Sequence, residues 1–350
     1  KYLREDYFNF KAILRQQLPD HLMDYEYYEA SPDPVRFIQQ AGSYPDFLLK
    51  VESNNNLLLQ KWNSESLNVI RYLQSMLPLR RPVEFMIIDL FTSHTQLTLV
   101  QLETLIQHQN SRIDSHSIRH AVCNLMGDFL IESEKRTHVK LIDKQEELII
   151  RGPDLVSMLN NGLVDEIVDT VRYGLLRFDR EFGQTPYQLP FFGLYQTYSM
   201  RDAALLSNLE KKFNSFRGSG LLRNHMDFFL YIDLHKDADV KESINYKDKI
   251  LSHQLIQWET PNATSQESTV GQRLIKNQEL GYSLHVFVRK YKKIDGQPQA
   301  YIYLGKANTV SFDPNSNKPI TMKLACESPL PDELYRELTL DTRKDLGHLS

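Results

Sequence analysis

The chain has 350 residues, of which 41% are hydrophobic and 25% are charged, and its formal net charge is −4. This composition is typical of a soluble globular protein, and its length favours two domains over one. No apolar run approaches the roughly 18 residues that span a bilayer, so no membrane contact is expected. Cys123 and Cys326 lie far apart and form no CxxC pair. We therefore expect no disulfide framework and a reducing, cytoplasmic location.

The charge is unevenly distributed along the chain. Residues 1–200 hold 20 Lys and Arg against 26 Asp and Glu, a net charge of −6. Residues 201–326 hold 18 against 13, a net charge of +5, and the last 24 residues hold 3 against 6. The middle segment is thus the one suited to a polyanion, although +5 over this length also falls within ordinary variation.

The first half of the chain is predicted to be mainly helical. Apolar spacing indicates helices over residues 7–18 and 54–77. A helix over 96–107, a second over 117–126, and strands over 137–142 and 147–151 then give the order of a winged helix, at about 85–152. Its second helix would present Arg112, His116, Arg119 and His120 to DNA, but its acidic surroundings equally suit a protein contact.

The second half is predicted to be rich in strands. Helices over 154–160 and 163–182 lead to a linker at 183–190, and a polar-faced helix follows over 198–213. Alternating residues predict strands over 228–234, 255–258, 284–288, 300–304 and 320–326. A short helix is expected over 332–338. Aromatic, carboxylate and amide groups on these strands and loops suit a flat polar ligand such as a nucleobase.

The sequence lacks the motifs that several kinds of binding and catalysis require. There is no GxxxxGK[ST] loop for ATP, no zinc spacing and no GxSxG. His116 and His120 are expected to be surface histidines without a third ligand. His138 and Lys140 begin an HxK pattern that lacks its aspartate, and the run from Asp233 to Lys236 is one residue out of register with a nuclease motif. A nuclease domain therefore stays a minor alternative.

Residues 172–338 resemble a C-terminal domain of bacterial modification-dependent restriction enzymes, which carry a phospholipase-D-type nuclease and a helicase motor. Residues 1–170 resemble the helical coupler that follows such a motor. The matching segments of the C-terminal domain include RYGLLRFDREFG at 172–183, INYKDK at 244–249, QWETPNATSQEST at 257–269, LHVFVRK at 284–290, YIYLGKA at 301–307 and PLPDELY at 329–335. Two positions depart from the family pattern: Met200 stands where the family has Arg, which is displaced to Arg201, and Thr260 stands where the family's Trp-x-Ser has Ser.

The resemblance implies an α+β chain with two domains. A helical coupler with a winged-helix-like part would span residues 1–185, and an SRA-like, PUA-related β-barrel would span 190–340. The barrel would read 5-methylcytosine or 5-hydroxymethylcytosine in double-stranded DNA by flipping the base. This fragment would do no chemistry and bind no cofactor. ATP and Mg²⁺ would serve the helicase and nuclease domains of the parent restriction enzyme, which would be its partners, and a homodimer is also allowed.

A flipped cytosine needs aromatic faces and an acceptor for its amino group. Tyr246 and Trp258 are the stacking candidates, Asp248 is the acceptor candidate, and Glu259 completes the predicted pocket. The alternatives are that Trp258 belongs to the core and that Tyr246 and Asp248 lie in a simple turn. Tyr231, Tyr282, Tyr301 and Tyr303 could line the pocket or build the core.

Phosphate contacts need cations on flexible stems. The candidates are Arg217, Arg223, Arg273, Lys276, Arg289, Lys290, Lys292 and Lys293. The run that starts at Arg289 could equally be a solvated hairpin end. A module that binds another protein subunit, with incidental cations, is the main alternative function.

Overall fold

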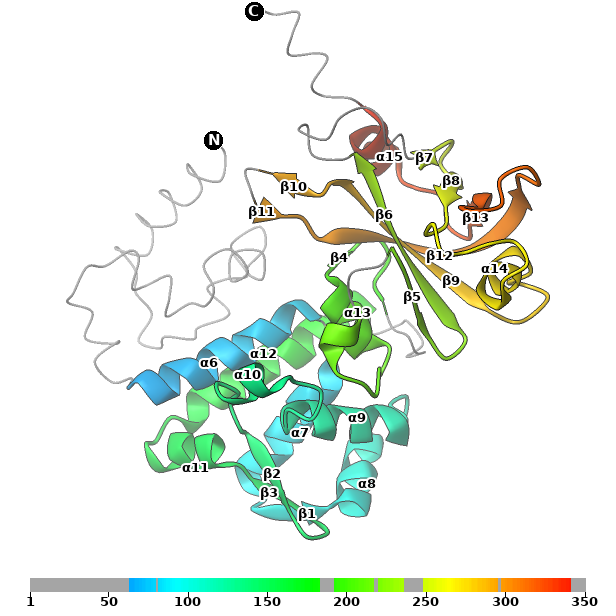
Figure 1. The fold of residues 1–350 in the computed structure, drawn as a ribbon. Helices are drawn as coiled ribbons and strands as arrows, with labels where there is room; N and C mark the ends of the chain where they lie inside the picture. The colour runs from blue at the N-terminus through cyan, green and yellow to red at the C-terminus, as the bar shows by residue number, and fades with distance from the viewer. Residues whose placement is uncertain are drawn as a thin grey trace, which may run out of the picture. The chain divides into compact units, whose positions relative to one another are not determined.

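The computed structural model describes residues 63–79, 81–182, 192–216, 220–235, 248–294 and 297–340. The chain divides into two compact units, residues 1–187 and 188–350, and the fold is mixed α+β (Figure 1). Four of the sequence predictions fall outside the described residues: the helix at 7–18, the linker at 183–190, Arg217 and Tyr246. The first part of the helix predicted at 54–77 does so as well.

Unit 1 combines helices with one small antiparallel sheet. The described helices are α6 (Ser64–Met76), α7 (Pro82–Ser93), α8 (Leu99–Gln109), α9 (Ser115–Leu125), α10 (Glu132–Lys135), α11 (Pro153–Asn160) and α12 (Val164–Phe182), with a 3-10 turn at Leu77–Leu79. The strands are β1 (Gln96–Thr98), β2 (Ile142–Gln145) and β3 (Leu148–Arg151), in the order β1-β3-β2.

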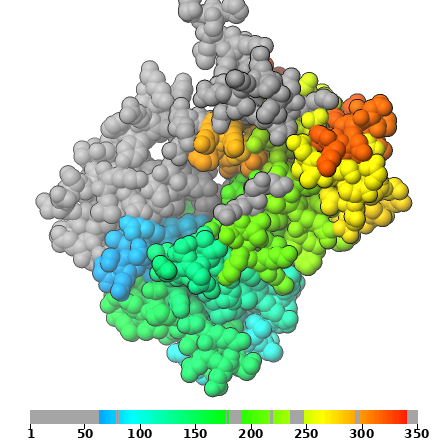
Figure 2. Space-filling model, viewed as in Figure 1, coloured from blue at the N-terminus to red at the C-terminus, as the bar shows by residue number. Residues whose placement is uncertain are grey.

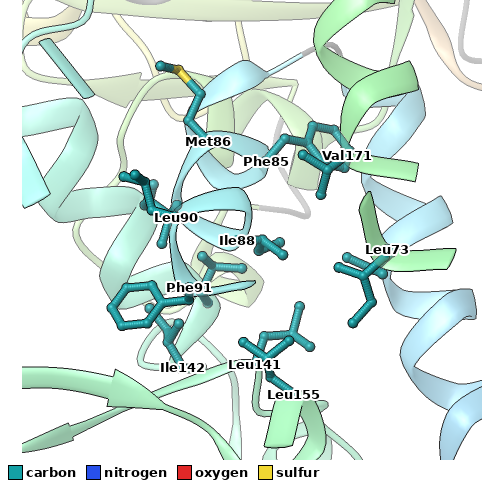
Figure 3. Close-up of a cluster of buried hydrophobic side chains, with 14 of the residues drawn as sticks. Leu73, Phe85, Met86, Ile88, Leu90, Phe91, Leu141, Ile142, Leu155 and Val171 are labelled. Carbon is teal, nitrogen blue, oxygen red and sulfur yellow. The ribbon is translucent and has the colours of Figure 1, made fainter. Parts of the chain in front are cut away.

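The helix α7 is the centre of this unit, and it is buried on nearly every side. Phe85, Ile88 and Phe91 of α7 are at most 1% exposed, and they pack among side chains of α6, α11 and α12 (Figure 3). The guanidinium of Arg151 donates to the carbonyls of Phe91 and Thr92, at 2.7 Å each, which ties β3 to the end of this helix. A helix that is apolar all round needs such a complete cover.

Side-chain caps decide where the two helices after α7 begin. Thr98 and Gln101 form a capping box, so α8 begins at Leu99 and the three residues before it pair with β3. Asp114 accepts from the amide of Ser117 and caps α9. The helix predicted from residue 96 therefore starts three residues later, because residues 96–98 form β1 instead. The strand predicted over 137–142 lies at Ile142–Gln145.

Unit 2 is built on one strongly curled sheet. Its strands are β4 (Thr197–Tyr198), β5 (Leu221–Asn224), β6 (Asp227–His235), β7 (Lys249–Ile250), β8 (Leu255–Glu259), β9 (Ser283–Tyr291), β12 (Tyr301–Phe312) and β13 (Thr321–Cys326). The order is β5-β6-β9-β12-β13-β8-β7, and β4 pairs with β12. A separate hairpin joins β10 (Lys293–Ile294) and β11 (Gln297–Pro298). The helices are α13 (Met200–Leu206), α14 (Thr269–Ile275) and α15 (Asp332–Thr339), with a 3-10 turn at Phe213–Ser215.

Alternation along the strands produces two different buried faces. Phe228, Val286 and Trp258 belong to an aliphatic-rich core that gathers residues from β6, β8, β9, β12, β13, α14 and α15. The register shifts in β12 near Tyr303 and Thr309 allow this long strand to bend. Within the described residues no strand joins β5 to β7, so the sheet is open rather than a closed barrel.

The opposite face of β6, β9 and β12 carries an aromatic cluster. Phe229, Phe287 and Tyr303 contact one another or the Phe192 ring, with centroids 4.9 to 6.4 Å apart. The sheet is therefore covered on both sides where these strands run together. None of the helices described is both long and apolar enough to cross a membrane.

Candidate nucleic-acid interface

Three of the predicted phosphate-binding residues meet at one end of the curled sheet. Arg223 of β5 and Arg273 of α14 lie over the ring of Tyr282, with guanidinium carbons 6.0 and 5.4 Å from its centroid. Arg223 also lies 5.9 Å from the Phe228 centroid. Lys276 is exposed at the C-cap of α14. We call Arg223, Arg273, Tyr282 and Lys276 the arginine–tyrosine cluster.

No acid among the described residues neutralises the cations of this cluster. Within the described ranges, no carboxylate lies within 4.0 Å of the side-chain nitrogens of Arg223, Arg273 or Lys276. The aromatic ring of Tyr282 instead offers its negative face to both guanidinium groups. Two arginines held on one ring, with no described carboxylate beside them, provide donors in a fixed arrangement, which suits an anion with several oxygens.

Two buried asparagines hold the turns that carry the cluster. The Asn224 amide donates to the carbonyl of Ser207 at 2.9 Å and fixes the β5–β6 turn. Asn277 is 1% exposed; its amide donates to the carbonyl of Tyr282 and to Asn308, and its oxygen accepts from the amide of Thr309. The segment between α14 and β9 is thus fastened to β12. Figure 1 shows α14 and the β5–β6 hairpin in this unit, and Figure 2 shows both segments at its surface.

Asp248 and Glu259 lie together beside the β7–β8 edge. The Asp248 carboxylate accepts from the backbone amide of Glu259 at 2.7 Å, and the Glu259 carboxylate accepts from the hydroxyl of Thr321 at 3.1 Å. Burial, together with the nearby charges of Glu259 and Asp233, raises the pKa of Asp248 to about 7 despite the bond from the amide. A carboxyl group in this state can exist in its neutral and its ionised form near neutral pH.

The structure places Trp258 in the core. Its side chain is 2% exposed and packs with the aliphatic residues of the inner face, while β8 pairs with β13 at the position of Met322. An indole in this position has no free face for a base. This is the packing alternative that the sequence left open, and a stacking role for Trp258 has no support from its surroundings.

The basic run at residues 289–293 is split between structural and exposed groups. Arg289 forms a paired hydrogen bond with the Asp233 carboxylate, and its guanidinium lies 4.2 Å from the Tyr301 centroid. The Lys290 ammonium donates to the carbonyls of Glu337 and Leu340 at the end of α15. Only Lys292 and Lys293 of this run are exposed. The pairing with Arg289 also occupies the Asp233 carboxylate that begins the near-match to a nuclease motif.

A buried polar chain, Asp227–His285–Tyr303, was missed by the sequence reasoning. The His285 ring bonds to the Asp227 carboxylate and to the Tyr303 hydroxyl, at 2.9 Å each, and His285 is fully buried. Burial lowers the pKa of His285, so the neutral ring donates to Asp227 and accepts from Tyr303. Its signal in the sequence is a histidine alternating with apolar residues at 284–288.

Tyr231, Tyr301 and Tyr303 line the aromatic face rather than an open pocket. Each is at most 6% exposed. Burial raises the pKa of all three hydroxyl groups. Of the four tyrosines named as possible walls, Tyr282 is the one that belongs to the arginine–tyrosine cluster.

The surface of α9 is less basic than its sequence indicated. Arg119 forms an ion pair with Glu103 at 2.8 Å, and the Arg112 side chain bonds to Asn110. His116 is exposed, but His120 is 2% exposed, bonds to Arg81 and stacks on Phe129 at 4.5 Å. The expectation that both histidines are surface residues is therefore wrong for His120, which the neighbouring α7 covers through the buried Arg81–Glu84 pair.

Across the part of the chain that the structure describes, no group of three His, Cys, Asp or Glu side chains is close enough to hold a metal ion.

The chain is an α+β protein of two units, and its second unit carries a cluster of cations that no described carboxylate pairs with. The chain belongs to the family described as a domain of unknown function, DUF8090, whose model matches residues 3–180. A second model, also a domain of unknown function, DUF3427, matches residues 192–338, and this domain is found in helicase-associated proteins. No curated protein matches the chain.

Proposed function

We propose that unit 2 binds double-stranded DNA through the arginine–tyrosine cluster. The observation that carries this proposal is the convergence of Arg223 and Arg273 on one tyrosine ring, with no described carboxylate to neutralise them. Phosphate oxygens are the natural partners of such donors, because guanidinium groups match their geometry and the backbone supplies many of them. The net charge of +5 over residues 201–326 agrees with a polyanionic partner.

The proposed target is DNA that carries 5-methylcytosine or 5-hydroxymethylcytosine. Asp248 supports this part, because a buried carboxyl group with a raised pKa can bond to the amino edge of an extruded cytosine. Glu259, whose backbone amide holds Asp248, would fix its orientation. Because Trp258 is buried, the stacking surface of the proposed pocket is assigned to neither it nor any other described residue. An SRA-like architecture is part of the proposal; the curled sheet with its two covered faces is compatible with it.

The exposed Lys292 and Lys293, which follow β9, would supply further phosphate contacts to the bound duplex.

In the parent protein, we propose that unit 1 couples DNA recognition to a helicase and a nuclease. The order α7, β1, α8, α9, β2, β3 supports a winged-helix-like assignment for this unit. ATP hydrolysis and Mg²⁺-dependent cleavage would then belong to other domains of a modification-dependent restriction enzyme. The ion pair between Arg119 and Glu103 makes α9 a weaker candidate for DNA contact than the cluster in unit 2.

The experiment is a titration of the chain with duplexes that differ only in one cytosine methyl group, at several salt concentrations. The proposal expects tighter binding to the methylated duplex and an affinity that falls steeply with salt. Replacing Arg273 with Ala should weaken binding to both duplexes, whereas replacing Asp248 with Asn should mainly remove the preference.

An Arg172→Ala variant is the matched control, because this arginine is exposed on α12 in unit 1. Equal binding of both duplexes would contradict recognition of the modified base. Failure to bind either duplex would favour the alternative of a protein-interaction module.

A further inference from the structure

Two exposed apolar side chains lie at the tips of the turns that carry the cluster. Met226 in the β5–β6 turn is 45% exposed, and Leu280 in the segment between α14 and β9 is 43% exposed. Large apolar side chains at such exposure are common singly, but here two of them belong to adjacent turns. The amide of Ser283 donates to the carbonyl of Met226 at 3.0 Å, and a Cβ built on Gly281 would lie 4.0 Å from the Met226 methyl carbon.

Cations frame this apolar pair. Arg223 lies three residues before Met226 on β5, and Lys276 lies four residues before Leu280 after α14. Arg273 reaches the same place through its contact with Tyr282, which is two residues after Leu280. A partner that covers Met226 and Leu280 must therefore also lie against three positive charges and the single negative charge of Glu279. DNA offers this combination, because its apolar base stack lies between two charged backbones.

Both turns are held in place before any partner binds. The buried residues Asn224 and Asn277 anchor them by hydrogen bonds. His225 and Gly281, each next to one of the apolar residues, have φ angles of +50° and +72°, which belong to tight turns. Only side chains would have to order on contact, so the entropic cost of insertion is small.

We propose that Met226 and Leu280 form an apolar wedge that enters the base stack of bound DNA. The inference rests on the proposed DNA binding and adds the way in which the duplex is opened. Insertion of aliphatic side chains between base steps costs a few kcal/mol of stacking, which contacts to the neighbouring phosphates offset. The wedge would unstack bases irrespective of methylation, and the modified base would be selected afterwards.

The test uses a duplex in which 2-aminopurine reports unstacking by its fluorescence. Wild-type chain should raise the fluorescence by about twofold or more on binding. A Met226→Gln, Leu280→Gln double variant should lose most of this rise and bind about 5- to 10-fold more weakly, while its affinity keeps the same dependence on salt. A Val310→Gln variant is the matched control, because Val310 is 56% exposed on β12 and should leave the signal unchanged.

The outcomes separate this inference from the proposed function. Salt-dependent binding without a fluorescence rise, or a full rise in the double variant, overturns the wedge and leaves DNA binding intact. Absence of salt-dependent binding by the wild-type chain overturns both. Thermal unfolding of each variant checks that the exposed substitutions leave the fold unchanged.

Discussion

Trp258 shows how burial changes the expected effect of a mutation at a predicted site residue. Its indole is 2% exposed within the core of the curled sheet. A Trp258→Ala change should therefore lower the free energy of unfolding by about 3–5 kcal/mol, because it leaves a large cavity. Denaturant unfolding measures this loss directly. A variant with wild-type stability and a selective loss of preference for modified DNA would instead restore the pocket assignment.

The raised pKa of Asp248 should make the stability of the chain depend on pH, with a defined sign. Burial raises its pKa from 3.8 to about 7, so the folded state holds a proton that the unfolded state releases in this range. The free energy of unfolding contributed by this group is therefore highest below about pH 4, falls as the pH rises towards 7, and levels off above it.

The size of this effect should be on the order of 1 kcal/mol or more between pH 5 and pH 8. Denaturant titrations of the wild type and of Asp248→Asn at several pH values measure it, because the amide has no proton to release. A wild-type and a variant profile that fall in parallel would show that Asp248 is not the responsible group.

At the scale of one residue, the sequence indicates the chemistry of a side chain but not which residues surround it in the fold. The sequence predicts Arg223, Arg273 and Lys276 as phosphate contacts, but only the fold shows that Tyr282 joins the two arginines. Arg289 is also an arginine, yet its paired hydrogen bonds to the Asp233 carboxylate give it a structural role. That difference depends on the pairing of β6 with β9, which no local pattern encodes.

Among the elements, α14 depends on a close contact at Gly271. A Cβ at this position would lie 2.0 Å from the carbonyl oxygen of Ser265, a backbone atom that cannot move independently. A Gly271→Ala change should destabilise the chain by about 1–3 kcal/mol and displace α14 from its loop. Because Arg273 lies on this helix, affinity for DNA should fall as well. An unchanged melting temperature would contradict this account of the helix.

The segment that follows α14 contains one acid that opposes the proposed contact. Glu279 is exposed next to Leu280. A Glu279→Gln change should strengthen DNA binding by about two- to fivefold at low salt, because it removes repulsion from the phosphates. Binding isotherms at two salt concentrations check this, with the gain shrinking at the higher one. Weaker binding by this variant would indicate that Glu279 itself contacts the partner.

The strands of unit 2 were largely predictable because their apolar residues alternate. The predictions at 228–234, 255–258, 284–288 and 320–326 each fall on a strand of the sheet. The full length of β12 was not predicted, because its last third is exposed and loses the alternation. The helix expected over 198–213 is shorter, since Ser199 caps its start and the helix ends at Leu206.

At the scale of the whole molecule, the proposed function depends on two features. The chain divides into two units, and residues 1–200 and 201–326 have net charges of opposite sign. The charge distribution predicts that residues 201–326 are the segment best suited to a polyanion, and the arginine–tyrosine cluster lies within it. The convergence of Arg223 and Arg273 on Tyr282 could not be predicted from the sequence. The elements that carry them, β5, α14 and the start of β9, meet only through the parallel pairing of β6 and β9. The order of strands in the sheet is likewise a property of the complete fold.

The salt dependence of DNA affinity tests the central claim most directly. The slope of the logarithm of the affinity against the logarithm of the salt concentration changes by about 0.9 for each phosphate contact in duplex DNA. We expect the Arg223→Ala, Arg273→Ala double variant to have a slope shallower by roughly two than that of the wild type, and Arg172→Ala to leave it unchanged. A double variant that keeps the wild-type slope and affinity would contradict the assignment of this cluster to DNA.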